Sequence, residues 1–445
     1  MKTKELDLLH DKVPYLFRNF AIPGILASLS MCLYGVINGI ILGRYVGTNA
    51  MAAVNIASPI FNIISCIAIL IAIGGNTLVG IRLGEKDYKK ANQYFNNAVT
   101  ALLVIGVAIW IAVVFFPSSL AKLVGANDVL LPYVKSYIQT FGFFVVPVLF
   151  NIIFGISLQS IGKPHLYMIG SMLTMALNII LDLLFICIFD WGVFGAALAS
   201  GCSATIVFII FLPQFGRRGG NLKIGVYKFD WKAFRQMAYN GSSEAITQFC
   251  LGISLLLFNW ILMKRFGETG VSAFAVVQYI SLVINAVILG MSRGVTAIIS
   301  VNYGAKANER VSHILKLAIK TVTLTGISCT VFLLLFKNLL IEMFVPDNQE
   351  VFSTAQEIIM FYSFTFIFVG ANVVINTFYT AVNDPKKSAI LAILRYFLLM
   401  ASFVALPIVI GNAGLWLSFT FAEVLCLLIS IITLQKQSPI RTSCQ

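Results

Sequence analysis

From residue 20 to residue 434 the chain alternates long apolar runs with short polar or charged segments. Each run is close to the roughly 20 residues that an α-helix needs to cross a bilayer. None shows the in/out alternation of about ten residues that is typical of outer-membrane strands. The pattern predicts an all-α integral membrane protein with twelve transmembrane helices, near 20–42, 53–81, 94–116, 132–158, 165–188, 192–213, 239–263, 272–300, 312–336, 352–380, 388–410 and 413–434.

Composition agrees with this prediction and limits which residue types can bind an ion within the membrane. Of the 445 residues, 59% are hydrophobic and only 11% are charged, whereas soluble domains carry roughly 25% charged residues. His10, His165 and His313 all fall in segments predicted to be cytoplasmic, and the cysteines have no CxxC spacing. We therefore expect neither an imidazole metal site nor a histidine proton relay in the membrane, so carboxylates must bind any ion there.

Basic residues are distributed unevenly between alternate segments. They concentrate in 1–18, 82–90, 163, 214–235, 306–310, 386–387 and 436–441, and the segments between these hold few. Lys and Arg are enriched in cytoplasmic loops, so we expect an inner cell membrane protein with both termini in the cytoplasm. The net charge of +13 is then a topology signal that faces the lipid bilayer, and no nucleic-acid partner is expected.

The two halves of the chain repeat each other. An offset of 220 aligns Gly47 with Gly267, Gly74 with Gly294, Gly84 with Gly304 and Lys86 with Lys306, and an offset of 221 aligns Asn151 with Asn372. Six helices per half is an even number, so the halves are parallel and related by a pseudo-two-fold axis along the membrane normal. We predict an N-lobe at 1–213, a basic linker at 214–237 and a C-lobe at 238–445.

Parallel repeats with a cavity at their interface favour a transporter that works by alternating access. The motifs "LYGVINGIILGRYVG", "GGNTLVGIRLGEKDYKKA", "GKP", "LNIILDLLFI" and "WGVFGAALAS" in the first half support this view. The second half adds "GSSEAITQF", "GMSRG", "ISVNYGAKANERV" and "NDPKKSAILAILR". In this ordered set, over nearly its whole length, the chain resembles the MATE (multidrug and toxic compound extrusion) family.

The resemblance implies export of bulky, often cationic organic compounds in exchange for protons or sodium ions, with no other cofactor. It assigns the coupling site to Tyr34, Asn178, Asp182 and Ser200, with Asp182 as metal ligand if the ion is sodium. One position departs from the pattern, because Asn38 stands where a first-helix aspartate is expected. The glutamate deep in the seventh helix of another branch is also missing, and Gln248 occupies that region.

The spacing and chemistry of Asn178 and Asp182 also favour an ion-coupling site. Asn178 and Asp182 are four apart, so they share one face of a helix. An aspartate at the centre of a membrane helix costs roughly 2.5–3.5 kcal/mol, which favours a functional interior position over a lipid-facing one. The alternative is a structural hydrogen-bond cluster that ties this helix to its neighbours. For Asn38, an uncharged ligand and a packing hydrogen bond are equally good interpretations.

Several polar residues are candidates for a substrate cavity. They are Asn151, Gln248, Asn259, Glu244 and Gln278. Glu244 suits either attraction of cations or helix capping, whereas Arg395 and Glu423 suit an interhelical ion pair. We expect a monomer that binds small organic substrates.

Three other functions are less consistent with the sequence. The Gly-Lys pair at 162–163 lacks the spacing of an ATP-binding P-loop. A lipid or oligosaccharide flippase, or another exporter of the same superfamily, is the alternative function, and it is expected to have more helices or a strongly basic cavity. A membrane-embedded enzyme would need a metal set or a nucleophile and base within the membrane.

Overall fold

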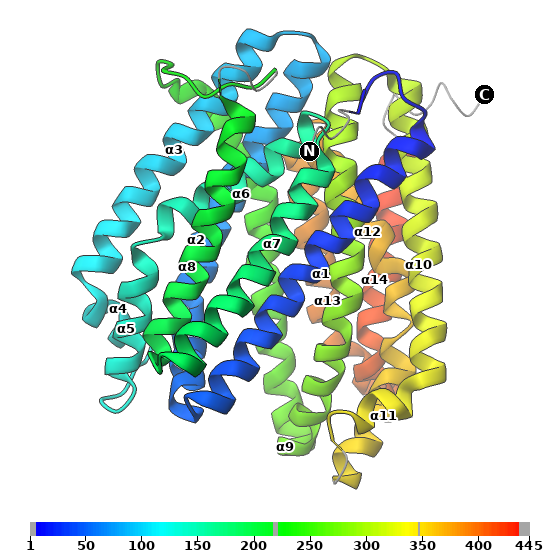
Figure 1. The fold of residues 1–445 in the computed structure, drawn as a ribbon. Helices are drawn as coiled ribbons and strands as arrows, with labels where there is room; N and C mark the ends of the chain where they lie inside the picture. Colours follow the sequence, from blue (N-terminus) through cyan, green and yellow to red (C-terminus); the bar gives the residue numbers. More distant parts are fainter. Residues whose placement is uncertain (1–5, 217–220, 346–347, 436–445) are drawn as a thin grey trace. The chain divides into compact units, whose positions relative to one another are not determined.

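A computed structural model describes residues 6–216, 221–345 and 348–435 of the chain (Figure 1). Over these residues it contains helices and no strand. The elements are α1 (Val13–Tyr45), α2 (Thr48–Gly84), α3 (Tyr88–Phe115), α4 (Pro117–Leu123), α5 (Leu131–Gly142), α6 (Val145–Ser160), α7 (Pro164–Asp182), η1 (Leu183–Ile188), α8 (Gly192–Phe211), η2 (Leu212–Phe215), α9 (Trp231–Gly304), α10 (Asn308–Glu342), α11 (Gln349–Tyr362), α12 (Thr365–Ala381), α13 (Pro385–Ile410) and α14 (Asn412–Gln435).

The twelve predicted spans are all found within the described residues. In the described part of the chain, nine helices are long and apolar enough to cross a membrane, and two bent pairs, α5 with α6 (56°) and α11 with α12 (52°), raise this number to eleven. Helix α9 supplies two spans, because non-helical backbone at Gly267 interrupts its 74 residues. The all-α membrane fold is thereby confirmed. The basic residues at 2, 4, 217, 218, 436 and 441, used for the prediction of orientation, lie outside the described residues.

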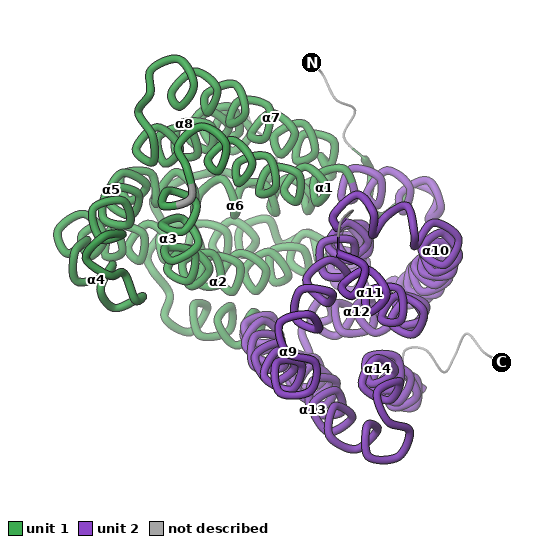
Figure 2. The backbone as a smooth tube through the Cα atoms, turned by 90° about the horizontal axis from the view of Figure 1, so that it is seen from below, with its two compact units in different colours: residues 1–10, 26–241 green, residues 11–25, 242–445 purple. Residues whose placement is uncertain are grey.

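The chain forms two compact units, which Figure 2 distinguishes by colour. Unit 1 comprises residues 1–10 and 26–241, and unit 2 comprises residues 11–25 and 242–445. The division into lobes at 213 and 238 stays a prediction. The compact units differ from it because the first turns of α1 belong to unit 2, whereas the linker and the first turns of α9 belong to unit 1.

The internal repeat is visible in the backbone. Residues with positive φ occur at equivalent positions of the two halves: Gly47 and Gly267, Lys86 and Lys306, Gly162 and Asn383, and Asp190 and Gly411. The first two pairs obey the offset of 220 and the last two obey the offset of 221. Because L-residues rarely adopt positive φ, these shared turns mark the same chain path repeated in each half.

Glycines allow helices to cross closely inside each unit. In unit 1, a Cβ at Gly74 would collide with the carbonyl oxygen of Met237, and one at Gly241 with that of Leu70. In unit 2, a Cβ at Gly294 would lie 2.7 Å from the carbonyl oxygen of Phe20. Each unit therefore packs the first turns of a helix from the other half of the sequence against a glycine face.

Candidate functional site

The carboxylate of Asp182 is enclosed in unit 1. Asp182 is the last residue of α7, and the π-helical turn η1 follows it directly. Asp182 and Asn178 are both 0% exposed. Single π-helical turns inside helices occur frequently at functional sites, because the extra residue displaces backbone groups from the regular ladder.

A directional chain of hydrogen bonds leads to this carboxylate. The hydroxyl of Tyr34 on α1 donates to Ser200 Oγ on α8 at 2.9 Å. Ser200 Oγ donates to the amide oxygen of Asn178 at 3.3 Å, and Asn178 Nδ2 donates to Asp182 Oδ2 at 2.9 Å. The amide has this orientation because the opposite one would set its oxygen against a carboxylate oxygen. Three helices thus bring the four predicted residues together.

Asn38 lies one helical turn after Tyr34, and its side chain is in hydrogen-bonding reach of the Tyr34 phenol. Two acceptor atoms in this cluster, Asp182 Oδ1 and Asn38 Oδ1, are buried and have no hydrogen-bond partner among the described residues. Buried polar atoms usually have partners. The cluster therefore has acceptor capacity left for a proton, a cation or a water molecule.

A further residue of this site was not predicted. Tyr137 on α5 is 6% exposed and interacts electrostatically with Tyr34 and Asp182. Its ring packs edge-on against Phe61, with the ring centroids 5.5 Å apart. Nothing in the sequence near Tyr137 distinguished it from the other aromatic residues of that helix, so only the packing of α5 on its neighbours identifies it.

The oxygen atoms of this cluster match the ligand preference of a hard monovalent cation. They come from one carboxylate, two amides and two hydroxyls, on Tyr34, Asn38, Asn178, Asp182 and Ser200. The described residues contain no group of three or more His, Cys, Asp and Glu side chains that is suited to a transition metal. The donor set therefore fits a proton or a sodium ion at Asp182.

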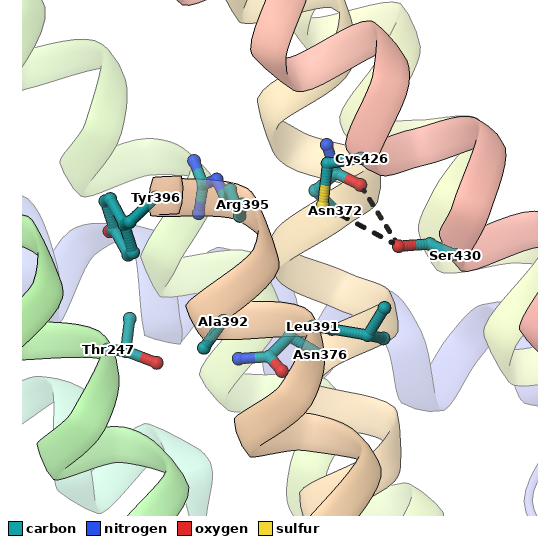
Figure 3. A pocket seen from close by; sticks show the side chains of 9 residues that line it. All are labelled: Thr247, Asn372, Asn376, Leu391, Ala392, Arg395, Tyr396, Cys426 and Ser430. Atoms are coloured by element: carbon teal, nitrogen blue, oxygen red, sulfur yellow. Dashed lines mark hydrogen bonds between the residues drawn. The ribbon is translucent and has the colours of Figure 1, made fainter. Parts of the chain in front are cut away.

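A second polar cluster lies in unit 2 and contains the predicted ion pair. Arg395 on α13 donates from Nε to Glu423 Oε1 on α14 at 2.6 Å, and its Nη2 lies 2.6 Å from the same oxygen. Asn372 on α12 donates to Glu423 Oε2 at 2.7 Å. The pair predicted from the sequence is confirmed. Figure 3 shows Arg395 and Asn372 beside a small pocket lined by Thr247, Asn372, Asn376, Leu391, Ala392, Arg395, Tyr396, Cys426 and Ser430.

The five residues proposed for a substrate cavity are divided between the units: Asn151 belongs to unit 1, and the other four belong to unit 2. Gln248 and Asn259 are exposed, whereas Asn151, Glu244 and Gln278 are half-buried. Glu244 interacts electrostatically with Arg293. Among the four in unit 2, the described residues show no hydrogen bond from one to another. Their role in binding substrate stays a prediction.

Asp182 has an apolar counterpart in the second half of the chain. The equivalent residue at the offset of 221 is Phe403, which is 2% exposed. Its ring packs against Phe258 and Phe419 at centroid distances of 4.6 and 5.2 Å. The repeat therefore preserves the backbone, and the two halves differ in chemistry at this position.

Comparison with known proteins places this architecture in a family. The sequence profile of the MatE family matches residues 23–184 and again residues 245–406, so each half of the chain matches the same profile. The multidrug export protein MepA of Staphylococcus saprophyticus is 24% identical over 419 residues, which cover 93% of this chain and 92% of the relative. The multidrug export protein MepA of Staphylococcus aureus strain MSSA476 is 22% identical over 419 residues, with 93% and 92% covered.

Solved structures show the same fold. A crystal structure of MATE in complex with MaL6 matches with a TM-score of 0.90 and 20% identity, covering 97% of this chain and 98% of that one. The outward-facing conformation of a multidrug resistance MATE family transporter of the MOP superfamily also matches, with a TM-score of 0.90, 20% identity and 97% coverage of both chains. From the double profile match and the shared fold, we conclude that this multi-pass membrane protein belongs to the MatE family of transporters.

Proposed function

We propose that the protein exports organic compounds, many of them cationic, in exchange for protons or sodium ions that bind at Asp182. The proposed direction, export, rests on the relatives, which are named export proteins. The names of the relatives, multidrug export proteins, support the substrate class. The aromatic residues of the chain, 36 Phe, 15 Tyr and 5 Trp, provide ring faces that attract organic cations.

The observation that carries this proposal is the unpaired carboxylate of Asp182. It is 0% exposed, and no Lys, Arg or His among the described residues forms an ion pair with it. A buried carboxylate without a countercharge is costly, and proton or cation binding relieves the cost. The Arg395–Glu423 pair shows the contrasting arrangement, in which a buried acid already has its cation.

A purely structural hydrogen-bond cluster does not account for an aspartate at this position. Asn178 Nδ2 donates to one carboxylate oxygen, and the other carboxylate oxygen has no described partner. An asparagine at residue 182 would accept the same hydrogen bond without a buried charge. The carboxylate adds only the ability to change charge, which is what coupling to an ion gradient requires.

The cycle that we propose has two half-reactions. When the site is open to the outside, a proton or sodium ion binds Asp182 and removes its negative charge. When the site is open to the cytoplasm, the ion leaves and the charged carboxylate favours entry of an organic cation. Because each ligand binds one state better than the other, their binding drives the exchange between states. No second acid is present at residue 38, so this site exchanges one charge per cycle.

The test uses the purified full-length chain in proteoliposomes with a fluorescent organic cation. Proton and sodium gradients are imposed separately, and transport is compared for the parent, Asp182→Asn and Asp190→Asn. Asp190 is an exposed acid eight residues further along the chain, with a φ of 55° that asparagine accepts readily, so Asp190→Asn is a matched control.

We expect Asp182→Asn to lose gradient-driven transport and Asp190→Asn to keep it. The stability of the Asp182→Asn protein should stay within roughly 1 kcal/mol of the parent, because the amide has the same shape. Equal transport by the parent and Asp182→Asn at every pH and with both gradients would refute the coupling role of Asp182.

A further inference from the structure

The first turns of α3 hold the linker by its backbone. Asn92 donates from Nδ2 to the carbonyl oxygen of Asn221 and accepts from the amide of Lys223, at 2.8 and 2.7 Å. Asn96 donates to the carbonyl oxygen of Lys223 and accepts from the amide of Gly225, both at 2.8 Å. Each carboxamide therefore pairs with the linker as a neighbouring strand would.

Asn97 completes this arrangement at the end of the linker. Its Nδ2 donates to the carbonyl oxygen of Asp230 and its Oδ1 accepts from the amide of the same residue, both at 2.9 Å. Between these contacts Leu222 is 0% exposed. Six hydrogen bonds and one buried side chain thus fix residues 221–230 along α3. Figure 1 shows this green segment beside the first turns of α3.

The apolar stretch of α3 indicates the depth of this segment. From Ala98 to Phe115, the end of the helix, the sequence has one polar side chain, Thr100. At 1.5 Å per residue this stretch is about 27 Å long, close to the roughly 30 Å hydrocarbon core of a bilayer. Asn97 therefore marks the membrane surface. Asn92, five residues earlier, lies about 7.5 Å farther into the water.

The linker carries exposed apolar side chains at this level. Val226 is 106% exposed and Trp231 is 69% exposed, and Tyr227 and Phe229 are 41% and 36% exposed. Trp231, Phe229 and Phe234 contact one another at ring-centroid distances of 5.2 to 5.8 Å. Trp and Tyr are enriched where membrane helices meet the headgroups.

Exposed cations alternate with these apolar residues. Lys223, Lys228, Lys232 and Arg235 all have exposed side chains, and within the described part of the chain none of them forms an ion pair. The one acid among them, Asp230, caps α9: its Oδ1 accepts from the amides of Lys232 and Ala233 at 2.8 and 3.2 Å.

We propose that residues 221–235 form a binding surface for the headgroups of anionic phospholipids, with Trp231 and its aromatic neighbours in the interface. This segment is called the linker anchor below. A soluble anion would need the cations but not the exposed rings. Juxtamembrane basic segments bind anionic lipid with about 1 kcal/mol per Lys or Arg, or about fivefold in affinity for each.

The linker anchor is independent of ion coupling at Asp182, because it consists of other residues and binds phospholipid headgroups instead of the coupling ion. It also assigns a role to α3. The asparagines at 92, 96 and 97 position the linker anchor at the membrane surface. Asn92 and Asn96 are four apart and share one face of the helix, whereas Asn97 directly follows Asn96 and lies beside that face.

Quenching of Trp231 fluorescence by brominated lipid tests this proposal. The full-length protein is placed in nanodiscs with increasing fractions of brominated phosphatidylglycerol or brominated phosphatidylcholine. The signal of Trp231 is the difference between the parent and Trp231→Phe. We expect strong quenching, with half-saturation at a lower fraction of phosphatidylglycerol than of phosphatidylcholine.

Two charge variants separate the linker anchor from general electrostatics. Replacing Lys223, Lys228, Lys232 and Arg235 by Gln should raise the half-saturating fraction of phosphatidylglycerol at least about tenfold. The control variant replaces Arg44, Lys122, Lys135 and Lys264 by Gln, which changes the net charge by the same amount. These four residues are exposed and lie in segments predicted to face outside, so the control should leave the half-saturating fraction of phosphatidylglycerol unchanged. Melting temperatures of both variants should match that of the parent.

Three results would overturn the proposal. Trp231 that neither lipid quenches would lie outside the bilayer. Equal shifts in the two charge variants would show that no local surface selects anionic lipid. Loss of the preference for phosphatidylglycerol in the presence of inorganic phosphate would indicate a soluble-anion site.

Discussion

The ion pair between α13 and α14 provides a quantitative test of the distinction between structural and functional charges. Glu423 accepts from Arg395 and Asn372, and the side chains of Arg395 and Glu423 are 18% and 9% exposed. We consider Glu423→Leu, which removes the carboxylate at similar volume. Asn372 keeps a partner in this variant, because its Nδ2 also donates to the backbone carbonyl oxygen of residue 423 at 2.9 Å.

The expected loss of stability follows from the Arg395 guanidinium, which Glu423→Leu leaves buried without an opposite charge. Removing one partner of a buried ion pair costs about 3–5 kcal/mol, because the other charge remains desolvated. For a cooperative unit of roughly 200 residues, each kcal/mol lowers the melting temperature by roughly 2–4 °C. We therefore expect Glu423→Leu to melt on the order of 10 °C below the parent. In Arg395→Met/Glu423→Leu no charge is stranded, and most of the loss should be recovered.

Tryptophan fluorescence during heating measures these variants. Trp416 on α14 is 0% exposed and donates to Glu357 at 3.2 Å, so its emission changes when this bundle opens. The four proteins of the double-mutant cycle give the coupling energy directly. The interpretation as a structural pair would be wrong if Glu423→Leu melted like the parent, or if the double variant were as unstable as the sum of both single variants.

Three further predictions concern unit 1. Asn38→Asp should add a second ionisation to the pH profile of transport and change the ion-to-substrate ratio, measured by reversal potential in liposomes; identical profiles would exclude residue 38 from coupling. Gly74→Val should lower the melting temperature, because overpacking against Met237 costs about 1–3 kcal/mol; an unchanged value would show that the helices separate freely. The backbone amide and the ammonium of Lys90 hold the pKa of Asp87 below its usual 3.8. The charged carboxylate should therefore protect the Lys90 amide from hydrogen exchange at neutral pH, and this protection should be lost as the pH falls through the lowered pKa. In Asp87→Asn the protection of the same amide should not vary with pH.

The sequence alone determined the number of spans, the internal repeat and the polar face of α7. These features depend on local rules: about 20 apolar residues cross a bilayer, and residues four apart share a helix face. The bends were harder to place, because no proline and no charged residue stands at the breaks at Phe143–Phe144 and Ser363–Phe364, within the 132–158 and 352–380 runs. The profile match to 23–184 and again to 245–406 supports the internal repeat.

Only the tertiary structure decided which polar groups have partners. Asp182 and Glu423 are both acids within apolar runs, yet Glu423 is paired with Arg395 whereas Asp182 Oδ1 has no described partner. The sequence could not place Tyr137 beside Asp182, or the linker on the asparagines of α3, because these contacts join residues far apart in the chain. Residues distant in sequence meet only through helix packing. The free energy of a buried charge depends on whether these residues provide an opposite charge or hydrogen-bond partners.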